Sequence, residues 1–111
     1  MKETNMTTTF ATKENMVQTV TRNVLEETLN GFWMFLQDTN LKNTVLRLVE
    51  RGAIEIDMSN LNKVDWDAEF RFRVVNMTML ELMQFTSLFV NSTHPDQMGM
   101  GADNVVWFWW D

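Results

Sequence analysis

Cysteine is absent from this 111-residue chain, and histidine occurs once. The lack of cysteine excludes disulfides, thiolate nucleophiles and zinc sites built on sulfur, and it fits the reducing cytoplasm, where we expect the protein to reside. Long apolar runs are also lacking: the longest, Val105–Trp110, is far shorter than the ~18 residues that cross a bilayer. The first twenty residues lack the basic start and apolar stretch of a secretory signal. We therefore expect no membrane partner.

Basic residues are scarce. The formal charge is −6, and the last eighteen residues contain no lysine or arginine but do contain Asp96, Asp103 and Asp111. Because affinity for nucleic acid comes largely from neutralising phosphates, this balance does not favour a nucleic-acid partner. An acidic surface fits solubility or a protein partner with a basic surface. The P-loop, GxGxxG and HExxH motifs are absent from the sequence, and we expect no cofactor.

Three helices are predicted from apolar residues that recur at steps of three and four. They cover residues 12–30, 39–51 and 78–93. Gly52 follows the second helix and suits a left-handed C-cap. Thr78 opens the third helix with a capping-box pattern. The second helix has the clearest start and stop signals of the three.

Strands are predicted over residues 53–58 and 69–75, where apolar and charged residues alternate. The arginines of the second strand can lie across from the acids of the first, a match worth about 0.2–1 kcal/mol per pair. This complementarity predicts that the two strands pair in antiparallel orientation. Residues 105–110 are a third strand by propensity.

The length and an ordinary share of apolar and charged residues predict one globular domain. We expect an α+β fold over residues 12–111, with about three helices packed on a small, mostly antiparallel sheet of about three strands. Residues 1–11 are expected to be a flexible arm or a short edge strand. Residues 32–36 are expected to form a buried strand or turn, and residues 96–103 a mobile loop with two glycines.

The C-terminal segment VVWFWW is apolar at every position, so both faces of a strand there need cover. It is either a central strand buried on both sides or a strand with one face packed against another molecule. Tryptophan is the residue most enriched at binding hot spots. We therefore predict a partner-binding role for Trp107, Phe108, Trp109 and Trp110. The ten methionines, including Met77, Met79 and Met83, are expected to fill the core, with an adaptable binding surface as the alternative.

Asp65, Asp67 and Glu69 alternate and share one face if they lie on a strand. We predict that these carboxylates, with Asp96 and Asp103, meet a basic partner surface. A small metal-dependent or ligand-binding enzyme is the alternative, in which the first three carboxylates hold Mg²⁺ and the single histidine, His94, assists. A polar outer strand face remains the simpler interpretation of the cluster.

The predicted function is therefore a non-catalytic protein-interaction module that forms homo-oligomers. Its size and composition are typical of the small inhibitors that phages and mobile elements encode against host or defence proteins. A third hypothesis starts from residues 40–58, whose helix, Arg-Gly and strand resemble a winged-helix fragment over less than a fifth of the chain. That resemblance implies a dimeric DNA-binding regulator that uses Lys42 and Arg47.

Overall fold

The computed structural model describes residues 10–16, 19–30, 38–58 and 68–110. In chain order, their elements are β1 (Phe10–Ala11), α1 (Lys13–Met16), α2 (Thr19–Asn30), α4 (Thr39–Arg51), β2 (Ile54–Asp57), β3 (Ala68–Val74), α5 (Met79–Thr93), β4 (Gln97–Met100) and β5 (Val105–Trp110). The predicted strand or turn at residues 32–36 lies outside the described residues. Among the helices of the described residues, none is long and apolar enough to cross a membrane.

The strands form one five-stranded sheet in the order β1-β2-β3-β5-β4, and every neighbouring pair is antiparallel. The α+β class and the antiparallel sheet are as predicted, but about three strands was too few. The predicted loop at residues 96–103 was also wrong, because Gln97–Met100 is strand β4 and pairs with β5. A segment with glycines and no alternation gives no local strand signal, whereas the ladder of β5 supplies the hydrogen bonds.

Charge complementarity sets the pairing of β2 with β3. Glu55 lies opposite Arg73 and Asp57 opposite Arg71, as predicted. Arg73 forms an ion pair of 3.2 Å with Glu55. Arg71 instead pairs with Glu69 of its own strand at 2.9 Å.

Helix α4 begins at an Asp38 N-cap and ends at the predicted glycine. The Asp38 side chain accepts a hydrogen bond from the Leu41 N–H at 2.9 Å, and Gly52 is a left-handed C-cap with φ of 81°. The N–H of Leu41, and then the side chain of Ser92 near the end of α5, holds the pKa of Asp38 below its ordinary value. The cap of α4 therefore also joins α4 to α5.

Helix α5 begins at a capping box in which Thr78 and Glu81 exchange hydrogen bonds of 3.0 and 3.1 Å. The backbone N–H of Thr78 is the main cause that lowers the pKa of the Glu81 carboxyl. The helix ends at His94, which has a left-handed φ of 51° directly before Pro95. His94 is thus a helix cap in a strained backbone region.

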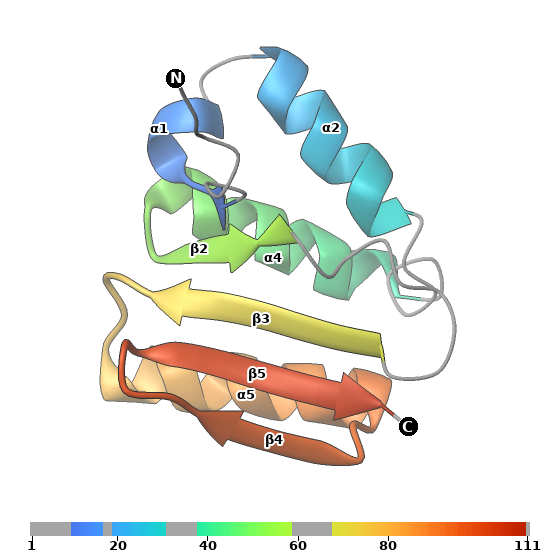
Figure 1. The fold of residues 1–111 in the computed structure, drawn as a ribbon, viewed down its shortest axis with the longest axis vertical. Helices are drawn as coiled ribbons and strands as arrows, with labels where there is room; N and C mark the ends of the chain where they lie inside the picture. Colours follow the sequence, from blue (N-terminus) through green and yellow to red (C-terminus); the bar gives the residue numbers. More distant parts are fainter. Residues whose placement is uncertain (1–9, 17–18, 31–37, 59–67, 111) are drawn as a thin grey trace, which may run out of the picture.

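The helices α4 and α5 lie behind the sheet, and no described helix lies in front of β3, β5 and β4 (Figure 1). The core fills the space between helices and sheet with aromatic rings. Phe89 of α5 stacks on Phe108 of β5 at 4.3 Å and on Phe70 of β3 at 5.0 Å. Trp110 closes one end of this core, where its Nε1–H donates to the Thr93 carbonyl at 2.8 Å.

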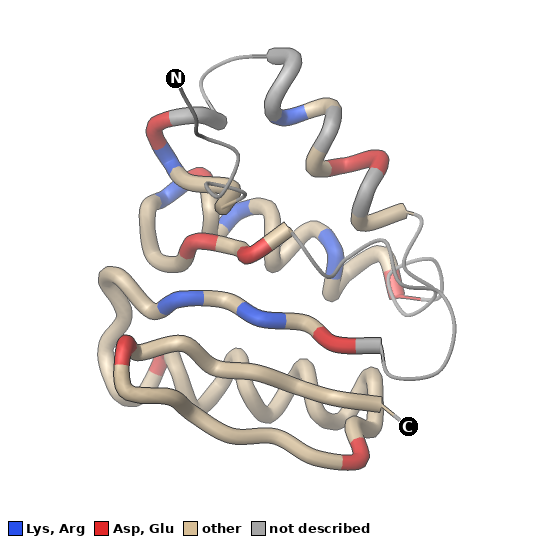
Figure 2. The backbone as a smooth tube through the Cα atoms, in the orientation of Figure 1, with Lys and Arg blue, Asp and Glu red and all other residues tan. Residues whose placement is uncertain are grey.

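Charge is unevenly distributed over the fold. Figure 2 shows lysine and arginine on α1, α2, α4 and β3, whereas α5, β4 and β5 have none. The described acids of this second half are Glu81, Asp96 and Asp103, which lie at its ends. Among the described residues, the molecule therefore has one half with charges of both signs and one half with acidic charges alone.

Candidate functional site on the open face of the sheet

Strand β5 is buried on one face and open on the other. Val106, Phe108 and Trp110 point to the helices and are buried, whereas Trp107 and Trp109 point to the opposite face and are half-buried. Of the four aromatic residues predicted for the interface, the structure thus places Phe108 and Trp110 in the core. Because every residue of this segment is apolar, the sequence has no alternation that distinguishes the buried face of the strand from the open face.

The strand register defines which side chains share the side that no described helix covers. Residues directly opposite each other in antiparallel strands point to the same face. We call this side the open face, and its residues are Phe10, Glu55, Asp57, Glu69, Arg71, Arg73, Gln97, Gly99, Val105, Trp107 and Trp109.

A shallow hollow of about 400 Å³ lies on the open face. It is lined by Trp107 and Trp109 of β5, Glu69 and Arg71 of β3, and Gln97 of β4. Sequence reasoning found the two tryptophans and Glu69 but missed Arg71 and Gln97 as lining residues. The alternation of β3 could have indicated Arg71, because it shares a face with Glu69. Nothing local marks Gln97, since β4 was not recognised as a strand.

Gly99 leaves room for the indole of Trp107. It lies opposite Trp107, and a Cβ at this position would meet Cζ2 of the indole at 2.5 Å. That distance is too short for a side chain, so the Trp107 indole occupies the space beside the Gly99 backbone that a side chain would fill.

Charged side chains on the open face are paired. Glu69 binds Arg71, Glu55 binds Arg73, and the Arg73 guanidinium lies 4.2 Å from the centre of the Phe10 ring. The tryptophans are therefore bordered by a polar area of both signs.

The structure describes only part of the predicted acidic cluster. Asp65 and Asp67 lie outside the described residues, and Glu69 lies in the hollow beside Trp109. Asp96 and Asp103 are exposed at opposite ends of β4 and are not brought together. Within the described ranges, no three acidic or histidine side chains gather closely enough to hold a metal ion.

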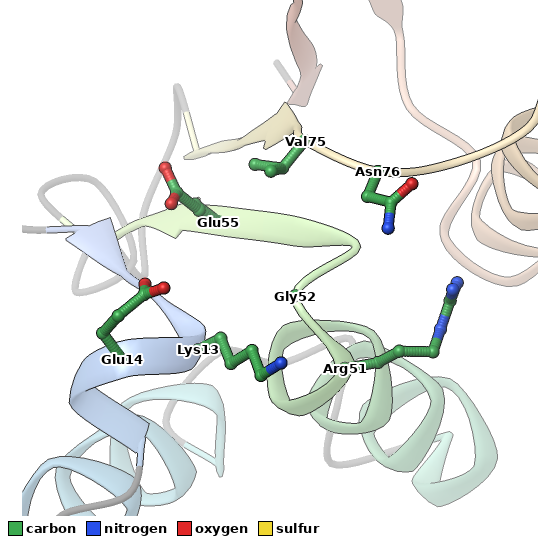
Figure 3. A pocket seen from close by; sticks show the side chains of 7 residues that line it. All are labelled: Lys13, Glu14, Arg51, Gly52, Glu55, Val75 and Asn76. Atoms are coloured by element: carbon green, nitrogen blue, oxygen red, sulfur yellow. The ribbon is translucent and has the colours of Figure 1, made fainter.

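A second, smaller hollow of about 210 Å³ lies where α1 meets the end of α4. Figure 3 shows its charged lining, with Lys13 and Glu14 from α1, Arg51 from the end of α4 and Glu55 from β2. Two acids and two bases line it together, so it presents no net charge to a ligand. Its lining offers no aromatic side chain.

Helix α4, which resembles a recognition helix in sequence, buries Leu41, Val45 and Val49 in the core. Of its basic residues, Lys42 donates to Asn30 at 2.9 Å and Arg51 pairs with Glu81 at 3.1 Å. No contact among the described residues adds support to the DNA-binding hypothesis, which stays a prediction.

Comparison of the chain with protein-family models, with curated proteins and with solved structures finds no match.

Proposed function

We propose that this protein is a non-catalytic interaction module that binds another protein through the open face of its sheet. The observation that carries the proposal is the pair Trp107 and Trp109, half-buried on a sheet face that no described helix covers. Two neighbouring indoles on such a face form an exposed apolar patch. Patches of this kind mark sites where a protein binds a partner, because a partner removes the apolar surface from water.

Tryptophan suits this role for a physical reason. It supplies a large contact area with few rotatable bonds, so little conformational entropy is lost when a partner covers it. The indole of Trp107 is already held across Gly99, which lowers that entropic cost further. The centre of the proposed interface is therefore rigid and aromatic.

The charged pairs supply the rim. Interfaces commonly have an apolar centre and a polar border, and Glu69, Arg71 and Gln97 border the tryptophans. Asp96 and Asp103 lie at the two ends of β4 and would meet basic groups at the edges of a partner. Asp65 and Asp67 belong to the same proposal by their place in the sequence, directly before β3.

An inhibitor role against a host or defence protein would use this face, and a phage or mobile-element origin stays a prediction. So does the cytoplasmic location. Homo-oligomer formation is part of the proposal.

The test is partner capture from native lysate of the source cells, followed by measurement of affinity with the purified partner. Trp107→Ala and Trp109→Ala should each weaken binding by at least about 30-fold, the effect of a hot spot worth about 2 kcal/mol. Val75→Ala is the matched control, because Val75 is apolar and 53% exposed but lies beyond β3 and does not line the hollow of Trp107 and Trp109. Undiminished affinity in both tryptophan variants would remove the proposal.

The electrostatic part is tested separately. Raising salt should weaken binding, and Asp96→Asn with Asp103→Asn should reduce that salt dependence, since both charges are solvent-exposed. Affinity that does not change with salt would contradict the acidic contribution while leaving the aromatic one intact.

A further inference from the structure

The outer edge of β4 is the second unusual surface of the molecule. β4 is the last strand in the sheet order, so no described strand pairs with its outer side. The Gly101 N–H donates to the Val105 carbonyl at 2.8 Å, so Gly101 uses its hydrogen bonds toward β5. Because hydrogen-bonding direction alternates along an antiparallel strand, the N–H and C=O groups of Met98 and Met100 point away from β5. These two residues therefore offer donors and acceptors to a further strand.

The side chains of β4 do little to prevent such pairing. Charged side chains, an internal proline or a very short strand usually protect a sheet edge. The opposite edge has such protection, because β1 is only two residues long. In contrast, Gln97–Met100 contains neither a charge nor a proline. In sequence, the nearest charges are Asp96 and Asp103, which lie beyond the two ends of the strand.

Exposed apolar side chains gather beside this edge. Among the described residues, five of the six large apolar side chains that are exposed belong to α5 or β4. Met98 and Met100 lie opposite buried residues of β5, so they point to the helix side of the sheet, where they are 45% and 54% exposed. On α5, Met79 and Met83 are 73% and 62% exposed. Met77 packs against the core as expected, but the expectation that Met79 and Met83 fill it was wrong.

Helix α5 has an apolar side that the described strands do not cover. One side of the helix forms a groove with α4 through Glu81, Gln84 and Leu88. Helical periodicity places Met79 and Met83 on the other side, away from α4 and toward β4. A hollow of about 460 Å³ continues along this side, and its lining residues are Leu82, Met83, Thr86, Ser87, Val90 and Asn91. A strand added beside β4 would point alternate side chains toward this hollow.

Charge indicates what kind of strand fits the edge. Glu81 pairs with Arg51 of α4 at 3.1 Å, so the described acids nearest to β4 are Asp96 and Asp103. Both are exposed, and α5, β4 and β5 contain no lysine or arginine (Figure 2). A second copy paired through β4 would bring acids beside acids in either orientation, which is repulsive. A segment with a basic residue at each end would bring opposite charges together instead.

We propose that β4 binds an extended segment of the partner protein as a sixth strand, with apolar side chains toward α5 and basic residues at both ends. The residues opposite Met98 and Met100 point to the helices, whereas the residue opposite Gly99 points to the open face beside Trp107. Main-chain hydrogen bonds supply the affinity in this mode of binding, and alternate side chains supply the specificity. Methionine suits the apolar contact because its flexible thioether adapts to different side chains.

This mode of binding rests on the proposed function, for which it names the part of the partner that the sheet recognises. The edge and the hollow of the tryptophans are continuous, because Gln97 of β4 lines that hollow. A partner on the open face therefore reaches β4 without leaving the surface of the sheet. A segment of about eight residues is long enough to cover β4 and reach both acids, at about 3.4 Å per residue.

The test uses synthetic peptides as partner segments, each with a fluorescent label whose anisotropy reports binding to the full chain. The first peptide alternates valine and threonine and has two lysines at each end. We expect it to bind saturably, with a dissociation constant below about 100 µM at low salt. The second has a proline at its centre and the third has glutamates in place of the lysines. Each of these should bind about tenfold more weakly, because the second loses strand hydrogen bonds and the third is repelled.

Two variants of the protein locate the bound peptide. Met98→Pro removes an outward N–H that β5 does not use, and Met100→Lys places a positive charge at the edge. Each should weaken binding of the lysine peptide by about tenfold with the circular dichroism spectrum unchanged, and Met100→Lys carries the test if Met98→Pro does not fold. Val75→Lys is the matched control, because it adds the same charge to an exposed apolar residue that lies beside α1.

The basic ends have their own test. Asp96→Asn combined with Asp103→Asn should weaken binding of the lysine peptide by about threefold to tenfold at low salt. Glu14→Gln combined with Glu27→Gln is the matched control, because it removes two exposed acids from α1 and α2 and should leave the affinity within about twofold. Equal weakening by the two double variants would contradict the placement of the basic residues at the ends of β4.

Three results would overturn the proposal. One is the absence of saturable binding up to about 1 mM of the lysine peptide, and another is undiminished binding in both Met98→Pro and Met100→Lys. The third is a wild-type chain that dimerises in sedimentation equilibrium and becomes monomeric in Met100→Lys, which would assign the edge to a second copy. Partner affinity separates the edge from the open face. Loss in Trp107→Ala without change in Met98→Pro removes the added strand alone, and the reverse result removes the open-face contact alone.

Discussion

The contact between Gly99 and Trp107 predicts that Gly99→Ala changes the free energy of unfolding in opposite directions in the wild type and in a Trp107→Ala variant. Alanine at position 99 must move the indole of Trp107 away from its Cβ. The distance from Cβ to Cζ2 has to grow from 2.5 Å to the 3.4 Å of ordinary van der Waals contact, a shift of roughly one ångström. The half-exposed ring has room to move outward, but it leaves its rotamer minimum and its contact with β4.

The expected magnitude follows from two opposing effects. Displacing the ring costs about 0.5–1.5 kcal/mol for the off-rotamer side chain, with lost dispersion contacts in addition. Replacing glycine by alanine in a strand gains about 0.5–1 kcal/mol, because glycine loses more backbone freedom on folding. We expect Gly99→Ala to lower the free energy of unfolding by about 1 kcal/mol in the wild type. In a Trp107→Ala background it should raise that free energy by about 0.5 kcal/mol.

The assay is urea denaturation of the wild type, the two single variants and the double variant, followed by circular dichroism. Tryptophan fluorescence is less suitable because the chain has five tryptophans. Measurements at two protein concentrations separate self-association, which makes apparent stability depend on concentration. A coupling energy of about 1.5 kcal/mol is expected between the two sites. A coupling energy below about 0.3 kcal/mol would refute the claim that the Trp107 indole requires a glycine at position 99.

Three further predictions concern the supports of the fold. Thr78→Ala should lower the free energy of unfolding by about 1 kcal/mol in urea denaturation, because it removes the N-cap of α5; no loss would contradict the capping box. The lowered pKa of Asp38 means that its contribution is complete above the ordinary carboxyl value near 3.8 and is lost as pH falls through the lower folded value. Asp38→Asn should therefore flatten the stability profile at acid pH, and an unchanged profile would show that this carboxylate is not a determinant. Trp110→Phe should cost about 1–3 kcal/mol, because the buried Thr93 carbonyl loses its donor, whereas Trp109→Phe on the open face should cost far less; equal effects would refute the burial argument.

The parts of the fold that were predictable depend on neighbours in sequence. Asp38 and Gly52 determine the ends of α4 through contacts within a few residues. The pairing of β2 with β3 was also accessible, because Glu55 and Arg73 are of opposite charge and each alternates with apolar residues. Local hydrogen bonds and complementary patterns can be read from one chain.

The parts that were missed depend on contacts between distant segments. β4 is a strand because β5 pairs with it and because Trp107 needs Gly99 beneath its ring, and neither requirement is visible in residues 97–100. The division of VVWFWW into a core side and an open side comes from Phe89 of α5, which covers Phe108. The segment alone identifies the importance of the tryptophans but not the direction in which each one points.

The uneven distribution of basic residues has a practical consequence for handling the protein. The last lysine is Lys63 and the last arginine is Arg73, so α5, β4 and β5 contain no primary amine and no trypsin site. Among the described residues, the lysines are Lys13 on α1 and Lys42 on α4, so coupling at either amine would leave Trp107 and Trp109 of β5 facing solution. Trypsin would release all three elements as one continuous peptide.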